Sequence, residues 1–176
     1  YNNALSHLQI RLLATQIPAG LVARYDMTDK PADEKAVDVS GRGYNGILSG
    51  TQLNDDRYIL PDQALRFNAA TDSIKASDAG LPDGALPRTQ CAWIRPSAYP
   101  TATYSIIFKY GIGASGRMSG LALKNANTVV HTAYDSSTYD HEVSYAVPLH
   151  SWTHICGTYS GTTSQIFING TSFGTF

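Results

Sequence analysis

The sequence has no excess of basic residues and no long apolar run. Thirteen lysines and arginines stand against fourteen aspartates and glutamates in 176 residues, which leaves a formal net charge of −1. A nucleic-acid-binding domain needs a basic surface to neutralise phosphates, so this balance argues against one. A membrane helix needs about 18 or more consecutive apolar residues, and no segment approaches that length. These two absences exclude nucleic acid and a membrane span from the functions considered for this segment.

Glutamate and cysteine are also scarce. Glutamate occurs only as Glu34 and Glu142, whereas the chain has fifteen glycines, sixteen threonines and eleven tyrosines. Glutamate is a common helix former, while threonine and tyrosine favour strands. Two cysteines are too few for a disulfide scaffold, and the 43% apolar fraction is ordinary for a globular core. The composition therefore predicts an all-β protein with one principal domain.

Only the start of the chain predicts a helix. Residues 3–16 combine a capping box at Ser6 and Gln9 with leucines at helical spacing, and Pro18 ends the segment. Further along, short strand-like runs alternate with turn residues, at 21–27, 45–49, 63–69, 72–76, 89–96, 104–110, 118–124, 127–134, 141–146, 151–159, 163–168 and 171–176. Between the last two runs, Asn169-Gly170 has the signature of a type I′ turn. Strands at this spacing predict a sandwich or jelly roll.

Six segments carry a resemblance to a known family. They are 21–25 (LVARY), 38–46 (DVSGRGYNG), 64–68 (ALRFN), 91–96 (CAWIRP), 152–159 (WTHICGTY) and 166–170 (IFING). In this order, over about 150 residues, they resemble the laminin-G-like, concanavalin A-like jelly-roll family in its bacterial and extracellular branch. The resemblance implies a two-sheet antiparallel β-sandwich that opens with strand 21–25. Trp93 and Trp152 are expected on strands that face a shared core, because an indole buries a large apolar area.

The order of the segments also predicts a domain organisation. The family's sandwich continues past such an Asn-Gly hairpin, and residues 1–16 look like the ending of a similar domain. We therefore expect residues 1–20 to be the tail of a preceding domain plus a linker. Residues 21–176 are then one jelly-roll domain of a tandem array, without its final strands. Residues that follow Phe176, a neighbouring copy, or the return of residues 1–6 of the same chain would complete the open sheet edge.

Two short motifs match cofactor or catalytic signatures without the required context. Residues 111–116 spell G-x-G-x-x-G, but a predicted strand follows them rather than a helix. Residues 170–174 spell the nucleophile elbow inside a hairpin, and no histidine follows. Neither motif predicts an enzyme.

Glycosidases of the concanavalin A type need paired carboxylates, which makes glutamate content a direct test. Glu34 lies in a polar segment, and the strand neighbours of Glu142, namely His141, Val143 and Ser144, supply no second carboxylate. The five histidines show no zinc-type spacing. We therefore expect no catalysis from this segment.

Calcium is the cofactor that the sequence favours. The polar segment 29–43 offers the oxygen ligands that a hard cation prefers. The resemblance implies a calcium near this loop in some members, and Asp38 matches that position best, with Asp29 as a second acid. The alternative is a solvated loop in which Asp38 makes an Asx turn.

Cys91 and Cys156 fall in two of the family segments. If the two strands are neighbours, a bridge would close a loop of about 65 residues and contribute roughly 4 kcal/mol. The alternative is two small buried thiols. A bridge would place the domain outside the cytosol.

Tyrosines in the middle of the chain are candidate ligand contacts, because each combines a flat apolar ring with a hydroxyl. The candidates are Tyr99, Tyr104, Tyr134, Tyr139 and Tyr145 together with His141, and of these Tyr99, Tyr134, Tyr139 and His141 are the ones we assign to the ligand site. The alternative is that they pack in the core.

We interpret the chain as a non-catalytic extracellular or cell-surface module that binds carbohydrate or a glycoprotein. One alternative is a structural repeat of a surface filament joined to neighbouring copies by strand exchange. Another is an accessory lectin-like domain of a secreted glycoside hydrolase. The inference rests on family resemblance, and a fold alone does not fix a function.

Overall fold

The structure is a computed structural model that describes residues 20–29, 31–101, 103–111, 118–132 and 140–176. The chain divides into two compact units, residues 1–79 and 80–176. The helix predicted for residues 3–16 lies outside the described residues. The boundary predicted near residue 20 also adjoins them, and it stays a prediction.

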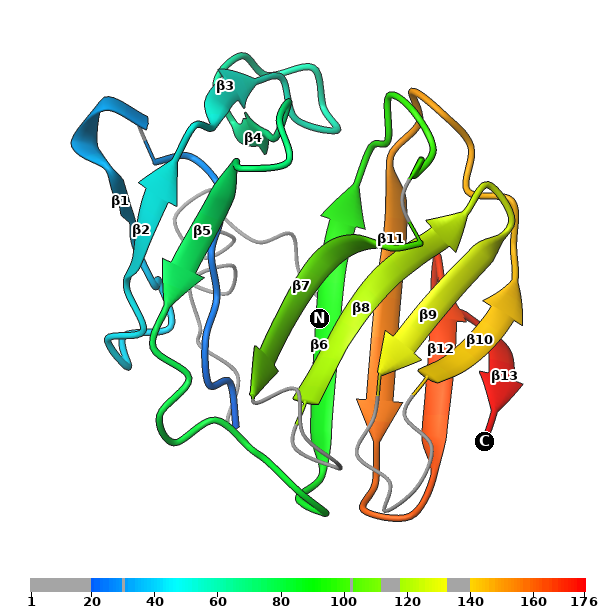
Figure 1. Cartoon of the computed structure of the whole chain (residues 1–176). Helices are drawn as coiled ribbons and strands as arrows, with labels where there is room; N and C mark the ends of the chain where they lie inside the picture. The colour runs from blue at the N-terminus through cyan, green and yellow to red at the C-terminus, as the bar shows by residue number, and fades with distance from the viewer. Residues whose placement is uncertain (1–19, 30, 102, 112–117, 133–139) are drawn as a thin grey trace, which may run out of the picture. The chain divides into compact units, whose positions relative to one another are not determined.

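The first unit contains short strands. Its elements are the 3-10 helix η1 (Pro31–Asp33) and the strands β1 (Lys35–Ala36), β2 (Gly46–Ser49), β3 (Gln52–Asn54), β4 (Ala64–Arg66) and β5 (Ser73–Ala76). They form an antiparallel sheet of order β1-β2-β5 and a separate β3-β4 pair (Figure 1). The runs expected at 45–49, 63–69 and 72–76 correspond to β2, β4 and β5.

The prediction of an opening strand at residues 21–25 is wrong, because the structure forms no strand there. Its backbone groups pair instead with a nearby loop. The Arg24 N–H donates to the Asp38 carboxylate at 3.0 Å, and the Val22 carbonyl accepts a hydrogen bond from the Ser40 hydroxyl at 3.1 Å. Polar side chains of the loop thus take the place of a strand partner.

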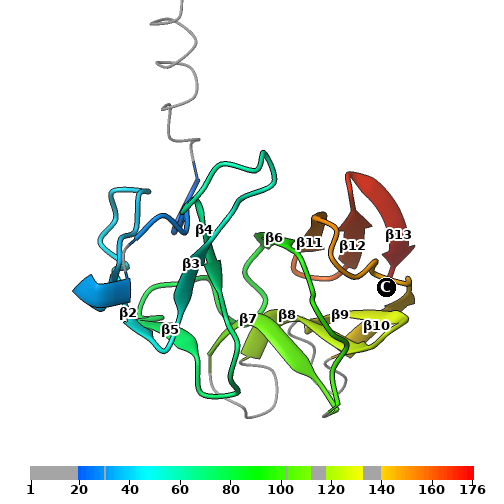
Figure 2. The same ribbon diagram turned by 90° about the horizontal axis from the view of Figure 1, so that it is seen from above.

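The second unit is a two-sheet antiparallel β-sandwich, which confirms the all-β, concanavalin A-like fold prediction. Its strands are β6 (Arg88–Ile94), β7 (Ser105–Gly111), β8 (Met118–Asn125), β9 (Thr128–Thr132), β10 (Asp140–Ser144), β11 (Thr153–Tyr159), β12 (Ser164–Ile168) and β13 (Thr171–Thr175). The sheet orders are β13-β12-β11-β6 and β10-β9-β8-β7. Figure 2 shows the two sheets of this unit as separate layers.

An aliphatic core fills the space between the two layers. All of its members except Val147 lie at alternating, inward positions of their strands. The members are Leu121, Leu123, Val129, Val143, Val147, Ile155, Ile166 and Ile168. The turn between β12 and β13 is confirmed as type I′ in character, because Asn169 and Gly170 have φ of 49° and 81°.

Trp93 does not face this core, which corrects the expectation of a shared indole core. Its side chain is 45% exposed, and Trp152 is half-buried just before β11. On β6 the inward positions include Arg88 and Gln90, which are both buried. Because β6 places polar residues inward, alternation puts Trp93 on the outer face.

A fully buried histidine also lies between the layers. His131 Nδ1 is 2.8 Å from Ser164 Oγ, whereas His131 Nε2 has no hydrogen-bond partner. The ring packs so closely on β11 that a Cβ built on Gly157 would lie 2.4 Å from it. Burial is the main cause that lowers the pKa of His131, to about 4, and the charges of His141 and Arg88 add to the effect. The imidazole is therefore neutral at physiological pH.

Candidate functional site

The outer face of the β10-β9-β8-β7 sheet carries a connected set of polar side chains, which we call the Tyr104 cluster: Tyr104, Lys124, Thr132, Asp140 and Glu142. The Tyr104 hydroxyl donates to Asp140 Oδ2 at 2.9 Å, and the Thr132 hydroxyl donates to Asp140 Oδ1 at 2.7 Å. Lys124 Nζ lies 2.6 Å from Glu142 Oε1. These contacts bring together residues from every strand of the sheet or the segment beside it.

Strand alternation explains why the two acids share a face. Val143 on β10 belongs to the core, so His141 points inward with it, and Asp140 and Glu142 point outward. The sequence analysis expected no second carboxylate beside Glu142, and this expectation is wrong. The run predicted at 141–146 begins one residue earlier in the structure, so Asp140 is a strand neighbour two positions away.

The Tyr104 contact reaches across the whole sheet. β7 and β10 are the two edges of the sheet, and the three strand spacings between them amount to about 14 Å. Side chains that meet over this width lie above the strands between them. Ala122 and Val130, which alternate outward on β8 and β9, are buried.

The charges of the cluster are set by its own contacts. The hydrogen bond to Asp140 is the main cause that raises the pKa of Tyr104, so its hydroxyl is a neutral donor. The hydrogen bond to Glu142 raises the pKa of Lys124, which keeps the ammonium charged. One positive and two negative groups offer donors and acceptors at fixed positions, with little net charge.

Of the tyrosines that the sequence made candidates, Tyr104 belongs to this cluster, whereas the residues assigned to the ligand site lie elsewhere or outside the described residues. Tyr99 is half-buried, and its hydroxyl donates to the Val147 carbonyl at 3.0 Å. His141 is half-buried, and its ring stacks on Phe176 with centroids 4.8 Å apart. Tyr134 and Tyr139 lie outside the described residues. The role of Tyr99 and His141 in binding stays a prediction.

The surroundings of Asp38 do not fit a calcium ligand. Asp38 is buried, and its two oxygens accept four hydrogen bonds, from Arg24 N–H, Ser40 N–H, Ser40 O–H and Tyr44 N–H. A carboxylate has about four lone-pair positions, so all are engaged by donors whose positive ends would repel a cation. Asp29 accepts a hydrogen bond from the Val37 N–H at 2.9 Å. The calcium expectation therefore gains no support from this geometry.

These contacts also control the charge of Asp38. Burial alone would raise its pKa, but the hydrogen bonds from Arg24, Ser40 and Tyr44 outweigh burial and lower the pKa to about 2. The carboxylate therefore stays ionised at neutral pH. Asp38 holds the surrounding loop together by accepting these hydrogen bonds, and its bond from the Ser40 N–H, two residues on, is the contact expected of an Asx turn.

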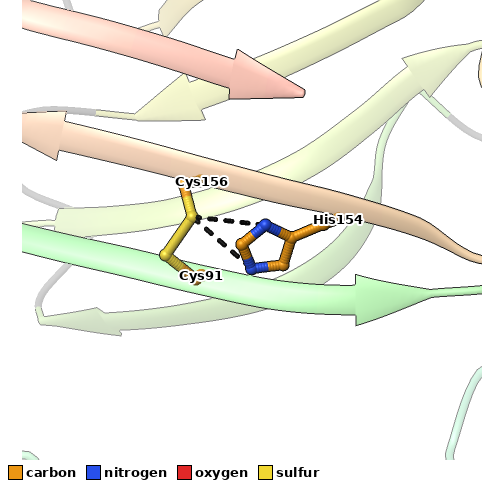
Figure 3. The surroundings of a disulfide bond; sticks show 3 residues. All are labelled: Cys91, His154 and Cys156. Carbon is orange, nitrogen blue, oxygen red and sulfur yellow. Dashed lines mark hydrogen bonds between the residues drawn. A yellow bond between two sulfur atoms is a disulfide. The ribbon is translucent and has the colours of Figure 1, made fainter. Parts of the chain in front are cut away.

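The outer face of the other sheet carries the two cysteines. Cys91 and Cys156 lie directly opposite each other on β6 and β11 and form a disulfide. The neighbouring pair on the same face is Trp93 and His154, whose ring centroids are 4.9 Å apart. Figure 3 shows the His154 ring beside the bridge, with Cys156 Sγ 3.9 Å from Nδ1 and 3.7 Å from Nε2.

Within the described residues, no helix is both long and apolar enough to cross a membrane. No curated protein and no solved structure matched the chain. A family model did match: the concanavalin A-like lectin/glucanases superfamily, of laminin-G type, aligns with residues 68–176. That range covers more than half of the chain and all eight strands of the sandwich. The chain therefore belongs to the concanavalin A-like lectin/glucanase superfamily.

Proposed function

We propose that this chain is a non-catalytic carbohydrate-binding module and that the Tyr104 cluster is its binding site. The observation that carries the proposal is the set of hydroxyl, carboxylate and ammonium groups that two hydrogen bonds and an ion pair hold on one sheet face. Sugar hydroxyls both donate and accept hydrogen bonds, so a fixed array of donors and acceptors suits them. A tyrosine ring adds a flat apolar surface for the C–H faces of a sugar. Membership of a lectin-containing superfamily agrees with this class of ligand.

The charges favour a neutral sugar chain. Lys124 contributes one positive charge, whereas Asp140 and Glu142 contribute two negative charges. An acidic polysaccharide would be repelled by this balance. A neutral oligosaccharide, either free or attached to a glycoprotein, meets no such penalty.

The same contacts argue against hydrolysis. A glycoside hydrolase needs one carboxyl group that gives a proton to the leaving oxygen. Glu142 is paired with the Lys124 ammonium, and Asp140 accepts two hydrogen bonds, so both carboxylates act as acceptors. The cluster is therefore arranged to hold a sugar rather than to cleave its linkage.

An extracellular location is part of the proposal. The Cys91–Cys156 bridge supports it, because disulfides persist in oxidising compartments.

The experiment is a screen of immobilised neutral oligosaccharides followed by calorimetry on the strongest ligand. Tyr104→Phe removes the hydroxyl that contacts Asp140 and should weaken binding about tenfold, the usual effect of losing one hydrogen bond to a charged group. Tyr58→Phe is the matched control, because Tyr58 is exposed in the first unit, and it should bind like the parent chain. The proposal fails if no neutral glycan is retained, or if Tyr104→Phe binds unchanged.

A further inference from the structure

The disulfide and its neighbouring histidine form the one group of three metal-ligating side chains found in the described part of the chain. The group comprises Cys91, His154 and Cys156, and their ligand atoms all lie within 4.8 Å of one another. In the oxidised chain the sulfurs are bonded to each other, so they are not thiolates. The chemistry of this group therefore depends on its oxidation state.

The backbone positions of these three residues are fixed without the bridge. β6 and β11 pair at seven successive positions, from Thr153 opposite Ile94 to Tyr159 opposite Arg88. The His154 N–H also donates to the Asn169 side chain at 2.9 Å, and its carbonyl accepts from the Asn169 N–H at 2.8 Å. Reduction removes one covalent bond from a strand pair that the sheet still holds in register.

The distances match the size of a zinc site. Zinc binds sulfur at about 2.3 Å and histidine nitrogen at about 2.0–2.1 Å, so neighbouring ligands of a tetrahedron lie about 3.5–3.8 Å apart. Cys156 Sγ already lies 3.7 Å from His154 Nε2 and 3.9 Å from Nδ1. Cys91 is exposed, so solvent can reach the group and fill a fourth position.

We propose that reduction of the Cys91–Cys156 disulfide converts this group into a zinc site with Cys91, Cys156 and His154 as ligands and one open position. A dithiol reductant exchanges with the bridge. Its two sulfurs become a disulfide, and Cys91 and Cys156 each leave with one electron and one proton as thiols. Zn²⁺ then displaces the two thiol protons and binds two thiolates and the imidazole. Two thiolates and one imidazole with an open position are a ligand set that zinc accepts.

This site is independent of the proposed carbohydrate site, because it lies on the outer face of the other sheet. It makes metal binding conditional on the redox state of the surroundings. The oxidised chain presents a closed bridge, and the reduced chain presents a metal-binding surface beside Trp93.

The test uses the full chain, reduced with dithiothreitol and freed of reductant by anaerobic gel filtration. Circular dichroism first checks that the reduced chain keeps its strands. Zinc calorimetry and a cobalt spectrum then measure binding, since thiolate-bound Co²⁺ has a charge-transfer band in the near ultraviolet. The reduced chain should bind one Zn²⁺ and show the cobalt band, whereas the oxidised chain should show neither.

Two variants assign the ligands. His154→Ala should weaken zinc binding at least ~10-fold, the scale expected for disturbing a metal site. His150→Ala, at an exposed histidine outside the group, should bind zinc like the parent. The proposal is overturned if the reduced chain loses its strands, if it keeps them and binds no Zn²⁺, or if His154→Ala binds zinc unchanged.

Discussion

The two units of the chain bury different kinds of side chain. Among the described residues of the first unit, the buried set is mostly small or polar: Ala36, Asp38, Ser40, Gly46, Leu48, Thr51 and Ala64. The second unit buries eight aliphatic side chains between two sheets. The first unit therefore depends on hydrogen bonds around one carboxylate, and the second depends on apolar packing.

The same contrast holds for the buried ionisable groups. Asp38 keeps its charge because four donors surround it, whereas His131 loses its charge because it is removed from water and lies near the charges of His141 and Arg88. Hydrogen bonds to a charged form stabilise that form, and burial without a countercharge destabilises it. The two units should therefore respond differently to mutation and to acid.

The largest expected effect is the loss of core volume in the sandwich. Ile155 is fully buried in the aliphatic core, so Ile155→Ala should lower the free energy of unfolding by about 2–5 kcal/mol. Ile47→Ala in the first unit is the matched control, because Ile47 is 65% exposed, and it should change stability by less than about 0.5 kcal/mol. Urea titration followed by circular dichroism measures both. Equal losses would show that the contrast in packing is wrong.

Acid should act on the sandwich first. The pKa of His131 is 6.5 when unfolded and about 4 when folded, so between these values the unfolded chain binds more protons and stability decreases as the pH is lowered. Full stability is present above pH 6.5, and the loss reaches about 3 kcal/mol at most near pH 4. Asp38 acts in a lower window, because its stabilising charge is lost as the pH falls from 3.8 toward 2.

NMR titration of the His131 ring in the folded chain measures the shift directly. His131→Leu removes the titrating group, so its stability should vary less between pH 6.5 and 4. A ring that titrates near pH 6.5 in the folded chain would contradict the prediction.

A smaller effect should follow from changing the charge that organises the first unit. Asp38→Asn replaces an oxygen with an amide that donates, so at least one of the surrounding donors loses its acceptor. The expected loss is about 1–3 kcal/mol, confined to this unit, with faster hydrogen exchange at the Arg24 and Tyr44 amides. Asp26→Asn is the control, because Asp26 is an exposed acid that contacts only Thr28 among the described hydrogen bonds. Equal hydrogen-exchange rates at the Arg24 and Tyr44 amides in both variants would show that the Asp38 carboxylate does not stabilise this loop.

The smallest expected effect concerns calcium. Because the Asp38 oxygens are engaged by donors, adding calcium or a chelator should leave the thermal midpoint unchanged. Differential scanning calorimetry with millimolar calcium and with EDTA measures this. A rise in the midpoint with calcium would restore the calcium expectation for Asp29 and Asp38.

The sequence predicted the strands of the sandwich well. Alternating apolar residues and turn signals place a strand within two residues of each boundary for most of β6 to β13. In the first unit the same method failed at residues 21–25. The backbone of that apolar run forms hydrogen bonds with side chains of a polar loop. The alternation of apolar and polar residues along a sequence does not indicate whether the backbone partner is a strand or a loop side chain.

Two aspects of the candidate sites were beyond sequence reasoning. Trp93 was placed on the wrong face because both faces of β6 carry apolar residues. Since Arg88 and Gln90 are polar yet buried, hydrophobicity does not show which alternate positions of β6 point inward. Tyr104 was among the candidate tyrosines, but its partners were missed, because Tyr104 and Asp140 are 36 residues apart and meet across the width of a sheet. A correct start for β10 would have given the Asp140 and Glu142 pair, but not their partners.

The contact between His131 and Gly157 has a consequence for how the two layers of the sandwich fit together. The imidazole occupies the space that the side chain of any residue other than glycine would need at position 157. The inward neighbours of Gly157 on β11 are Ile155 and Tyr159, two residues away on either side, and both carry large side chains. A shift of one sheet along the other would bring the ring against one of them, so the space at Gly157 favours the observed relative position of the two sheets.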